Sequence, residues 1–248
     1  MLKHALYRSW LGLFIMFLMH PVTYAQDTVS NGDVKEYYHD GNIKSEKNYR
    51  NGELNGSFRE YYPNGNLLSV GYYKNGQLQG AYKSYYKDGS VNVEKNYVNG
   101  QQAGVSHEYY ENEAPKSIEN YSNDTLNGFN QYFYPNGSLK ITMNFKKGKL
   151  YGTSREYNQD GSLKNEINYE DDHISGVSKE YADNGKLYAV WNYKKDHKNG
   201  PSKTFYDNGQ VQWEMFFKDG QLQGPVKMYS PQGKILVETN YKNSAPVK

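Results

Sequence analysis

The chain has 248 residues, 29 basic against 27 acidic side chains, and no cysteine. The lack of cysteine excludes disulfide bridges and thiolate metal sites, and the near balance of charge argues against nucleic acid or anionic lipid as a bulk electrostatic target. Aromatic residues make up 16% of the chain, most of them tyrosine. This composition is typical of a strand-rich fold with a thin core.

The first 25 residues have the pattern of an export signal. A basic start at Lys3 and Arg8 precedes an apolar run over residues 10–19, and a small-residue cleavage pattern ends at Ala25, directly before Gln26. The run is about ten residues long, whereas roughly 20 are needed to span a bilayer. We therefore expect cleavage and an exported protein that is periplasmic, envelope-bound or secreted, with an uncleaved anchor as the alternative. Cleavage leaves 27 basic and 27 acidic residues.

The rest of the chain repeats every 24 residues. One series of turn glycines comprises Gly41, Gly65, Gly89, Gly137, Gly161, Gly185, Gly209 and Gly233, with Glu113 in the one remaining slot. A second series keeps the same step without a gap at Gly56, Gly80, Gly104, Gly128, Gly152, Gly176, Gly200 and Gly224. Nine copies without insertion or deletion indicate a repeat protein, whose function is sought on a surface shared by several units.

Each copy contains two strand-like runs, and a turn follows each run. Asn64-Gly65 predicts a β-hairpin with a type I′ turn, in which both central residues need a positive φ. The second turn, residues 74–80, ends at Gly80, and we expect this glycine to need either a positive φ or a close backbone approach. Nine hairpins predict an all-β fold, an elongated antiparallel ribbon or solenoid of roughly eighteen strands. The predicted organisation is a signal peptide over 1–25, a lead-in over 26–33, the nine-copy repeat domain over 34–241 and a tail over 242–248.

A two-residue turn at Asn64-Gly65 also fixes the strand register. It pairs Arg59 with Val70, Tyr61 with Leu68 and Tyr62 with Leu67. In five hairpins the same register places opposite charges across from each other, as Lys35–Glu46, Lys83–Glu94, Arg155–Glu166, Lys203–Glu214 and Lys227–Glu238. Such a pair stabilises an antiparallel ladder by about 0.2–1 kcal/mol.

Two columns of the repeat are aromatic in every copy. The first, named the tyrosine stripe, comprises Tyr37, Tyr61, Tyr85, Tyr109, Phe133, Tyr157, Tyr181, Phe205 and Tyr229. The second comprises Tyr49, Tyr73, Tyr97, Tyr121, Phe145, Tyr169, Tyr193, Phe217 and Tyr241. A third column, from Ile43 and Leu67 to Ile235, is aliphatic except for Pro115. Strict alternation puts the stripe on the face of the ion pairs and the other two columns on the opposite, packed face.

The tyrosine stripe is the candidate partner-binding surface. Exposed aromatic rings stack on sugars and anchor protein partners. The alternative is that these rings are structural and cover lysine stems and the sheet itself.

No motif predicts catalysis, a cofactor or a bound metal. His39, His107, His173 and His197 lie in four different columns, so they form no ladder of metal ligands. Glu36, Glu60, Glu108, Glu156 and Glu180 form one recurring environment, whereas catalysis needs distinct acid and base roles. Asp171, Asp172 and Asp196, with Asn123 and Asp124, offer a weak Ca²⁺ hypothesis that turn chemistry alone explains.

The fourth copy is irregular. Glu113 replaces a turn glycine, Pro115 would begin a strand, which proline tolerates, and Asp124 stands where glycine is usual. We interpret this as sequence drift, with a kink or a partner site as the alternative.

The repeated unit Tyr-Tyr-x-Asn-Gly-x-Leu followed by Tyr-x-Asn-Gly-x-Leu-x-Gly resembles the variant MORN repeat. Long arrays of this repeat occur in bacterial proteins labelled as YwqK-family antitoxins. The resemblance covers residues 34 to 244 and implies a twisted antiparallel ribbon that acts by binding and has no catalytic residues. An antitoxin for a cytosolic toxin would not need the export signal in residues 1–25.

The sequence thus favours an exported, non-enzymatic scaffold that binds an unidentified protein, with an antitoxin- or immunity-like role implied by the resemblance. The alternatives are a glycan- or envelope-binding module that uses the tyrosine stripe, and a peripheral membrane scaffold. The neutral mature chain counts against the membrane class and against nucleic acid.

Overall fold

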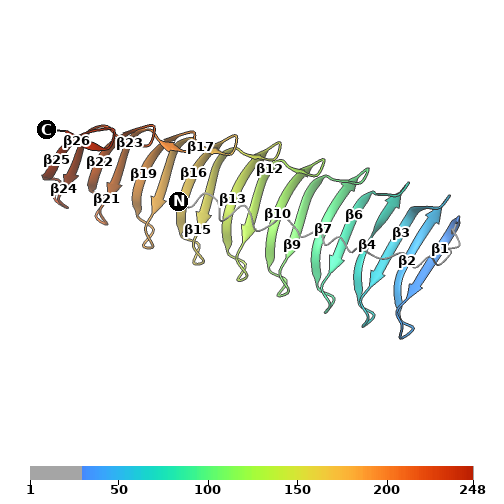
Figure 1. Cartoon of the computed structure of the whole chain (residues 1–248). Coiled ribbons are helices and arrows are strands. Elements are labelled where there is room, and N and C mark those ends of the chain that lie inside the picture. Colours follow the sequence, from blue (N-terminus) through green and yellow to red (C-terminus); the bar gives the residue numbers. More distant parts are fainter. Residues whose placement is uncertain (1–29, 248) are drawn as a thin grey trace.

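The computed structural model describes residues 30–247, and every element in that range is a β-strand. The predicted signal peptide lies outside the described residues. Figure 1 shows successive hairpins side by side in chain order, from β1 (Asn31–Tyr37) to β26 (Ala245–Val247), in one open and twisted sheet. Residues 30–247 contain no helix that is long and apolar enough to cross a membrane.

Eighteen long strands form a continuous antiparallel meander, which confirms the predicted all-β ribbon. After β1 they are β2 (Ile43–Arg50), β3 (Glu53–Tyr61), β4 (Leu67–Lys74), β6 (Gly80–Tyr85), β7 (Val91–Val98), β9 (Gly104–Tyr109), β10 (Pro115–Ser122), β12 (Gly128–Phe133), β13 (Leu139–Lys146), β15 (Gly152–Tyr157), β16 (Leu163–Glu170), β18 (Gly176–Tyr181), β19 (Leu187–Lys194), β21 (Gly200–Phe205), β22 (Val211–Lys218), β24 (Gly224–Tyr229) and β25 (Ile235–Lys242). Strand residues therefore lie on both sides of the range 34–241 that the repeats were expected to occupy.

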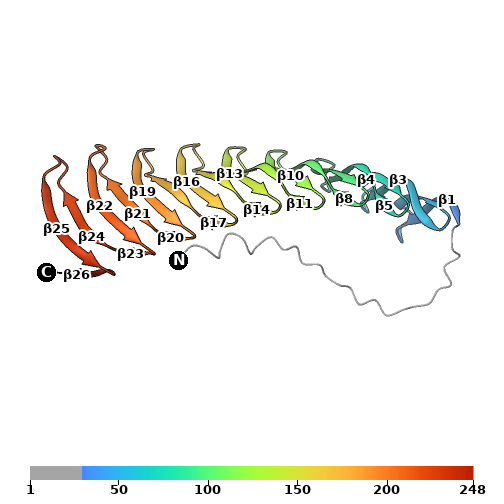
Figure 2. The same cartoon turned by 90° about the horizontal axis from the view of Figure 1, so that it is seen from above.

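Most of the remaining short strands directly follow the second turns. They are β5 (Gln77–Leu78), β8 (Gln101–Gln102), β11 (Thr125–Leu126), β14 (Lys149–Leu150), β17 (His173–Ile174), β20 (His197–Lys198) and β23 (Gln221–Leu222), with β26 at the end of the ribbon. These turns stack on one another, since the amide of Gly76 donates to the carbonyl of Leu54 at 2.8 Å and Gly100 does the same to Leu78 at 2.9 Å. Figure 2 shows the long strands bent along their length.

The first turn differs from the predicted type I′ turn. The amide of Gly65 donates to the carbonyl of Tyr62 at 2.9 Å, the amide of Tyr62 donates to the carbonyl of Asn66 at 2.8 Å, and Gly65 has a φ of 86°. This is a type I turn followed by a left-handed glycine. Pro63 fits the first central position of a type I turn, but it is not required, because the copies with His39 and Lys87 at this position form the same two backbone hydrogen bonds.

The prediction of the register is right in the body of the hairpin and wrong at its tip. Arg59 faces Val70 as expected, but Tyr61 pairs with Leu67 and not with Leu68. The register shifts by one residue there because the turn is followed by a β-bulge. The aliphatic column therefore lies directly across from the tyrosine stripe, and strict alternation does not extend to the tip.

The type I′ conformation occurs in the second turn instead. Asn75 and Gly76 have φ values of 50° and 72°, and Lys74 pairs with Gln77 across them. Gly80 ends the turn segment with a φ of 77°, which confirms the expected positive φ. At Gly56 the close approach applies as well, since an added Cβ would lie 2.7 Å from Cβ of Asn48.

The packed face is the one that carries Lys47, Phe58 and Tyr73. Phe58 contacts the ring of Tyr73 at 4.9 Å between centroids and that of Tyr82 at 6.4 Å, so the second aromatic column lies on this face as predicted. Small residues alternate with these rings and let neighbouring hairpins approach. The most buried of them are Ser45, Ser69, Ser106, Ser117, Ser154, Ser178, Ala189 and Ser202.

A further tyrosine column, one position after the tyrosine stripe, was not singled out from the sequence. It links six hairpins to the hairpin that follows each of them. In six repeats its hydroxyl donates to the backbone carbonyl of the stripe residue in the following repeat, at 2.6–2.9 Å. The donors are Tyr38, Tyr62, Tyr86, Tyr110, Tyr134 and Tyr206. We name these bonds the tyrosine staples. The equivalent positions in the sixth and seventh repeats are Asn158 and Ala182.

The irregular fourth copy keeps the fold. Glu113 adopts a φ of 63°, the conformation that glycine has in the other copies, and Pro115 begins β10 as predicted. Asp124 has a φ of 60°, and its carboxylate accepts a hydrogen bond from the amide of Gln102 at 2.7 Å. The carboxylate thus ties this turn to the preceding one.

Candidate functional site

The face opposite the packed face, here named the ion-pair face, carries all five predicted charge pairs. Their shortest nitrogen–oxygen distances are 2.8 Å for Lys35–Glu46, 2.6 Å for Lys83–Glu94, 2.8 Å for Arg155–Glu166, 2.7 Å for Lys203–Glu214 and 3.4 Å for Lys227–Glu238. Glu166 also binds Lys179 of the next hairpin at 3.1 Å. The pairs therefore connect hairpins as well as strands.

The charge pairs control the ionisation of their carboxyl groups. Hydrogen bonds from Lys35 and Tyr61 hold the pKa of Glu46 below its ordinary value. At Glu166, burial acts to raise the pKa, but the hydrogen bonds from Lys179 and Arg155 outweigh it and lower the pKa. Both carboxylates stay charged at neutral pH, so this face presents a row of fixed opposite charges.

The tyrosine stripe lies on the ion-pair face, as predicted, but most of its rings are half-buried. Tyr37, at one end of the ribbon, is the exception, with 57% of its surface exposed. Several stripe hydroxyls donate to the glutamate of the preceding charge pair. These bonds are Tyr61 to Glu46 at 3.0 Å, Tyr109 to Glu94 at 3.5 Å, Tyr181 to Glu166 at 3.3 Å and Tyr229 to Glu214 at 2.7 Å.

Burial and the neighbouring glutamate both raise the pKa of Tyr61 and Tyr181. Their hydroxyls therefore stay protonated and complete the charge network. The structure thus joins the stripe to the charge pairs of the first, third, sixth and eighth hairpins.

An exposed apolar column runs beside the charge pairs, and the sequence analysis missed it. Its apolar members are Ala81, Val105, Phe129, Val177, Pro201 and Pro225. Phe129 has 47% of its surface exposed. The column lies two residues before the basic member of each charge pair, so period-two alternation could have placed it on the ion-pair face.

The side chains of one asparagine column form hydrogen bonds between neighbouring hairpins, at the point where the second turn separates their strands. The side-chain amide of Asn48 donates to the carbonyl of Ser57 at 2.8 Å, and Asn144 does the same to Thr153 at 3.2 Å. Asn120, Asn168 and Asn192 make the corresponding bonds to Phe129, Val177 and Pro201. Asparagine occupies this column in seven of nine copies because its amide satisfies a carbonyl of the next hairpin.

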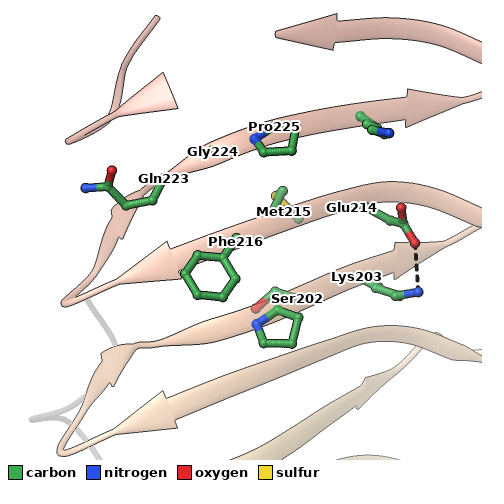
Figure 3. Close-up of a pocket in the computed structure, with 10 residues that line it drawn as sticks. Ser202, Lys203, Glu214, Met215, Phe216, Gln223, Gly224 and Pro225 are labelled. Atoms are coloured by element: carbon green, nitrogen blue, oxygen red, sulfur yellow. Dashed lines mark ion pairs between the residues drawn. The ribbon is translucent and has the colours of Figure 1, made fainter. Parts of the chain in front are cut away.

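Tyr72 and Phe216 are the two exceptions in the asparagine column. Each ring lacks the amide and has 45% of its surface exposed. Phe216 faces Pro201 across the β21–β22 ladder, and Figure 3 shows it beside Pro225 and Gln223 of the next hairpin. A large exposed ring where the repeat prefers a structural asparagine is a candidate contact residue.

A shallow hollow of about 670 Å³ surrounds Phe216. Its apolar lining is Pro201, Met215, Phe216 and Pro225, and its charged lining is Lys203, Glu214 and Lys227. The Lys203–Glu214 ion pair closes one side, as Figure 3 shows. The hollow combines an apolar centre with a charged rim, an arrangement found in protein interfaces.

The histidines and acidic residues that the sequence raised as ligand candidates lie in turn and ladder contacts. His173 Nδ1 lies 2.7 Å from a carboxylate oxygen of Asp196 across neighbouring turns, and the carboxylates of Asp172 and Asp196 accept the amides of Leu150 and Ile174 at 2.8 and 2.9 Å. Within residues 30–247, no three histidine or acidic side chains cluster as a metal-binding group.

The acidic column is also engaged in repeated contacts. Glu36 and Glu60 accept the hydroxyls of Ser45 and Ser69, both at 2.9 Å. Glu108 binds Lys116 at 2.7 Å. Each of these contacts lies within one hairpin, between the glutamate and a residue eight or nine positions further along the chain.

Solved structures add little to this geometry. A crystal structure of a TcdB2–TccC3–Cdc42 assembly matches with 13% identity over 86% of this chain and 14% of that chain, at a TM-score of 0.21. A Photorhabdus luminescens Tc holotoxin pore matches with 13% identity over 85% of this chain and 13% of that one, again at 0.21. The chain thus spans only a small part of these proteins, and scores this low carry no argument about function. No curated protein matches the sequence.

The family comparison is decisive for the repeat. The model described as "MORN repeat variant" matches eight segments, at residues 30–51, 54–75, 78–99, 128–147, 150–171, 174–195, 198–219 and 222–243. The unmatched stretch between residues 99 and 128 contains the irregular fourth copy, whose hairpin the structure nevertheless retains. The chain belongs to the MORN repeat variant family.

Proposed function

We propose that this protein is an exported, non-enzymatic scaffold that binds another protein through its ion-pair face, with the hollow around Phe216 as the principal contact. The family supports a binding repeat. The export signal in residues 1–25 supports a location outside the cytosol. Similar repeat arrays are labelled as antitoxins. On that label, the proposed partner is a toxic protein that this chain binds and inhibits outside the cytosol.

The observation that carries the proposal is the exposure of Phe216 in a column where the repeat otherwise uses asparagine. Aromatic residues in apolar pockets with a polar rim dominate the binding energy of protein interfaces. Pro201 and Pro225 flank the ring, and rigid neighbours reduce the entropy lost on binding. The charges of Lys203, Glu214 and Lys227 at the rim supply specificity for a partner of complementary charge.

The test replaces Phe216 by the residue that its column prefers. Phe216→Asn introduces the structural asparagine of seven other copies, so the variant is expected to fold. Tyr72→Asn makes the same change at the other exception, far along the ribbon from the hollow, and is the matched control. Affinity is measured by calorimetry between the mature protein and its partner, isolated from the native envelope by cross-linking.

We expect Phe216→Asn to weaken binding at least about tenfold, which corresponds to roughly 1.4 kcal/mol, and Tyr72→Asn to leave it unchanged. Equal affinity of wild type and Phe216→Asn contradicts the proposal. Retention on cell-wall polysaccharide that the triple variant Tyr61→Ala, Tyr85→Ala, Tyr157→Ala removes, while Phe216→Asn does not, replaces it by the glycan hypothesis. Strong, salt-insensitive flotation with liposomes replaces it by the membrane hypothesis.

A further inference from the structure

The tyrosine staples are interrupted at two consecutive positions, Asn158 and Ala182. At Asn158 the side chain turns to its own hairpin, where its amide donates to the hydroxyl of Ser162 at 3.0 Å. Ala182 has only a methyl group. The carbonyl of Phe205, which the staple of that repeat would reach, therefore receives no hydroxyl from residue 182.

A hollow of about 460 Å³ lies at this position. It is lined by Lys186, Leu187, Phe205, Asp207, Asn208 and Gly209. Leu187 belongs to the hairpin of Ala182, and Phe205 to the next hairpin. One repeat further along, Tyr206 spans the equivalent interval and donates to the carbonyl of Tyr229 at 2.7 Å. The hollow thus lies between two neighbouring hairpin tips, as the tyrosine staples do elsewhere in the ribbon.

Contacts between the two turns hold the walls of this hollow in place without the ring. Lys186 Nζ donates to the carbonyl of Asp207 at 2.6 Å, and the amide of Asn184 donates to the carboxylate of Asp207 at 3.1 Å. Asparagines make the corresponding turn-to-turn bonds elsewhere, as from Asn208 to the carbonyl of Pro231 at 2.8 Å. The spacing of the two hairpin tips is therefore maintained, and the slot stays open.

We propose that the slot beside Ala182 receives a tyrosine side chain of the partner protein, whose hydroxyl donates to the carbonyl oxygen of Phe205. This inference rests on the proposed function, since it assumes a protein partner. The occupant follows from the repeat itself: in six other copies, the residue that fills this interval and bonds this carbonyl is tyrosine. Leu187 and the stem of Lys186 supply apolar contact for the ring, and burial of an aromatic ring with a bonded hydroxyl is favourable.

The slot can be tested without the partner. N-acetyltyrosinamide is titrated into the ¹⁵N-labelled mature protein at millimolar concentrations, and the amide shifts of Leu187, Phe205 and Gly209 are followed. We expect saturable shifts confined to this site. N-acetylphenylalaninamide, which lacks the hydroxyl, should bind several-fold more weakly, because it cannot donate a hydrogen bond to the carbonyl of Phe205.

Three variants make the test specific. Ala182→Tyr supplies the ring from the chain itself and should abolish the shifts, while Ala182→Leu, which fills the slot without a hydroxyl, should do the same and serves if the first variant misfolds. Tyr206→Ala should create a second slot, with new shifts at Tyr229. Absence of saturable shifts in the wild type, or shifts that persist unchanged in Ala182→Tyr and Ala182→Leu, overturns the proposal.

Measurements of partner binding distinguish failure of this inference from failure of the proposed function. We expect Ala182→Tyr to lower the affinity for the partner at least several-fold. If Ala182→Tyr binds the partner as the wild type does while Phe216→Asn does not, the slot is refuted and the scaffold function stands. If the probe binds the wild-type slot but Phe216→Asn leaves partner affinity unchanged, the role of the Phe216 hollow is refuted and the slot stands.

Discussion

The hydroxyl of Tyr134 donates to the carbonyl oxygen of Tyr157, one full repeat further along the chain, at 2.9 Å. This bond joins two neighbouring hairpins near their tips, where the hydroxyl of Ser138 also donates to the carbonyl of Gln159 at 3.0 Å. In a repeat protein, stability is approximately the sum of unit stabilities and nearest-neighbour interfaces. Each staple is therefore expected to contribute separately to the cohesion of the ribbon.

Removal of one staple should lower the free energy of unfolding by about 1 kcal/mol. Tyr134→Phe keeps the ring and deletes only the hydroxyl, which isolates the hydrogen bond. The reverse change, Asn158→Tyr, should add a staple to the carbonyl of Tyr181 and stabilise by a similar amount. Urea unfolding followed by circular dichroism measures both. A Tyr134→Phe variant as stable as the wild type shows that the staple contributes nothing.

The glutamates of the charge pairs should make stability depend on pH in the acid range. The pKa of Glu166 is lowered in the folded state, so its contribution is present above the unfolded value and is lost as pH falls through the folded pKa. Glu166→Gln should therefore be less stable than the wild type at about pH 7, and the difference should vanish once the pH lies below the folded pKa of Glu166. Unfolding free energies of both proteins across this range provide the measurement. A difference that is constant with pH contradicts the assignment.

Lys198 stands where most copies place leucine on the packed face. Its Nζ lies 3.0 Å from the ring centroid of Trp191 and 5.4 Å from that of Phe217, and burial lowers its pKa despite the opposing charge of Glu180. A buried ammonium is costly even with aromatic neighbours. Lys198→Leu should raise the unfolding free energy by about 1 kcal/mol.

The gain at Lys198 should also depend on pH. Because the folded pKa is lowered, the penalty on the wild type is present at neutral pH and is relieved as pH rises through the folded value toward 10.5. The advantage of Lys198→Leu should therefore shrink in alkali. Lys195→Leu, an exposed position in the preceding turn, is the control and should change little. A destabilised Lys198→Leu shows that the contact with Trp191 outweighs the burial of charge.

Export predicts a defined mature end. The full-length chain expressed with its first 25 residues should be recovered outside the cytosol with Gln26 at its N-terminus. Intact mass and N-terminal sequencing after cell fractionation provide the check. Recovery of the uncleaved chain in the membrane fraction supports an anchor, and recovery in the cytosol contradicts export.

The period and the ladder could be predicted from the sequence, because each depends on residues within one or two hairpins. Lys35 and Glu46 lie eleven positions apart and are brought together by a single turn, so alternation alone places them correctly. The prediction of the turn type was wrong. Asn64-Gly65 and Asn75-Gly76 are identical dipeptides, but only the second adopts the type I′ form, and the dipeptide alone does not distinguish a two-residue loop from a three-residue loop closed by a bulge.

The candidate site was harder to predict because it depends on contacts between repeats. The tyrosine stripe was chosen for its regularity, yet regular residues such as Tyr61 bond to the neighbouring hairpin and are half-buried. Phe216 and Ala182 matter as departures from their columns. Their meaning becomes clear only once Asn192 and Tyr206 show what the usual residue does at each place.

The most direct test of the central claim is site-specific cross-linking in the native envelope. A photoreactive phenylalanine replaces Phe216 in one variant and Tyr72, an aromatic residue of equal exposure outside both hollows, in another. If Phe216 is the principal contact with the partner, position 216 gives one discrete protein adduct that unmodified mature protein competes away, and position 72 gives none. Equal adducts from both positions, or no adduct from position 216, would contradict that claim.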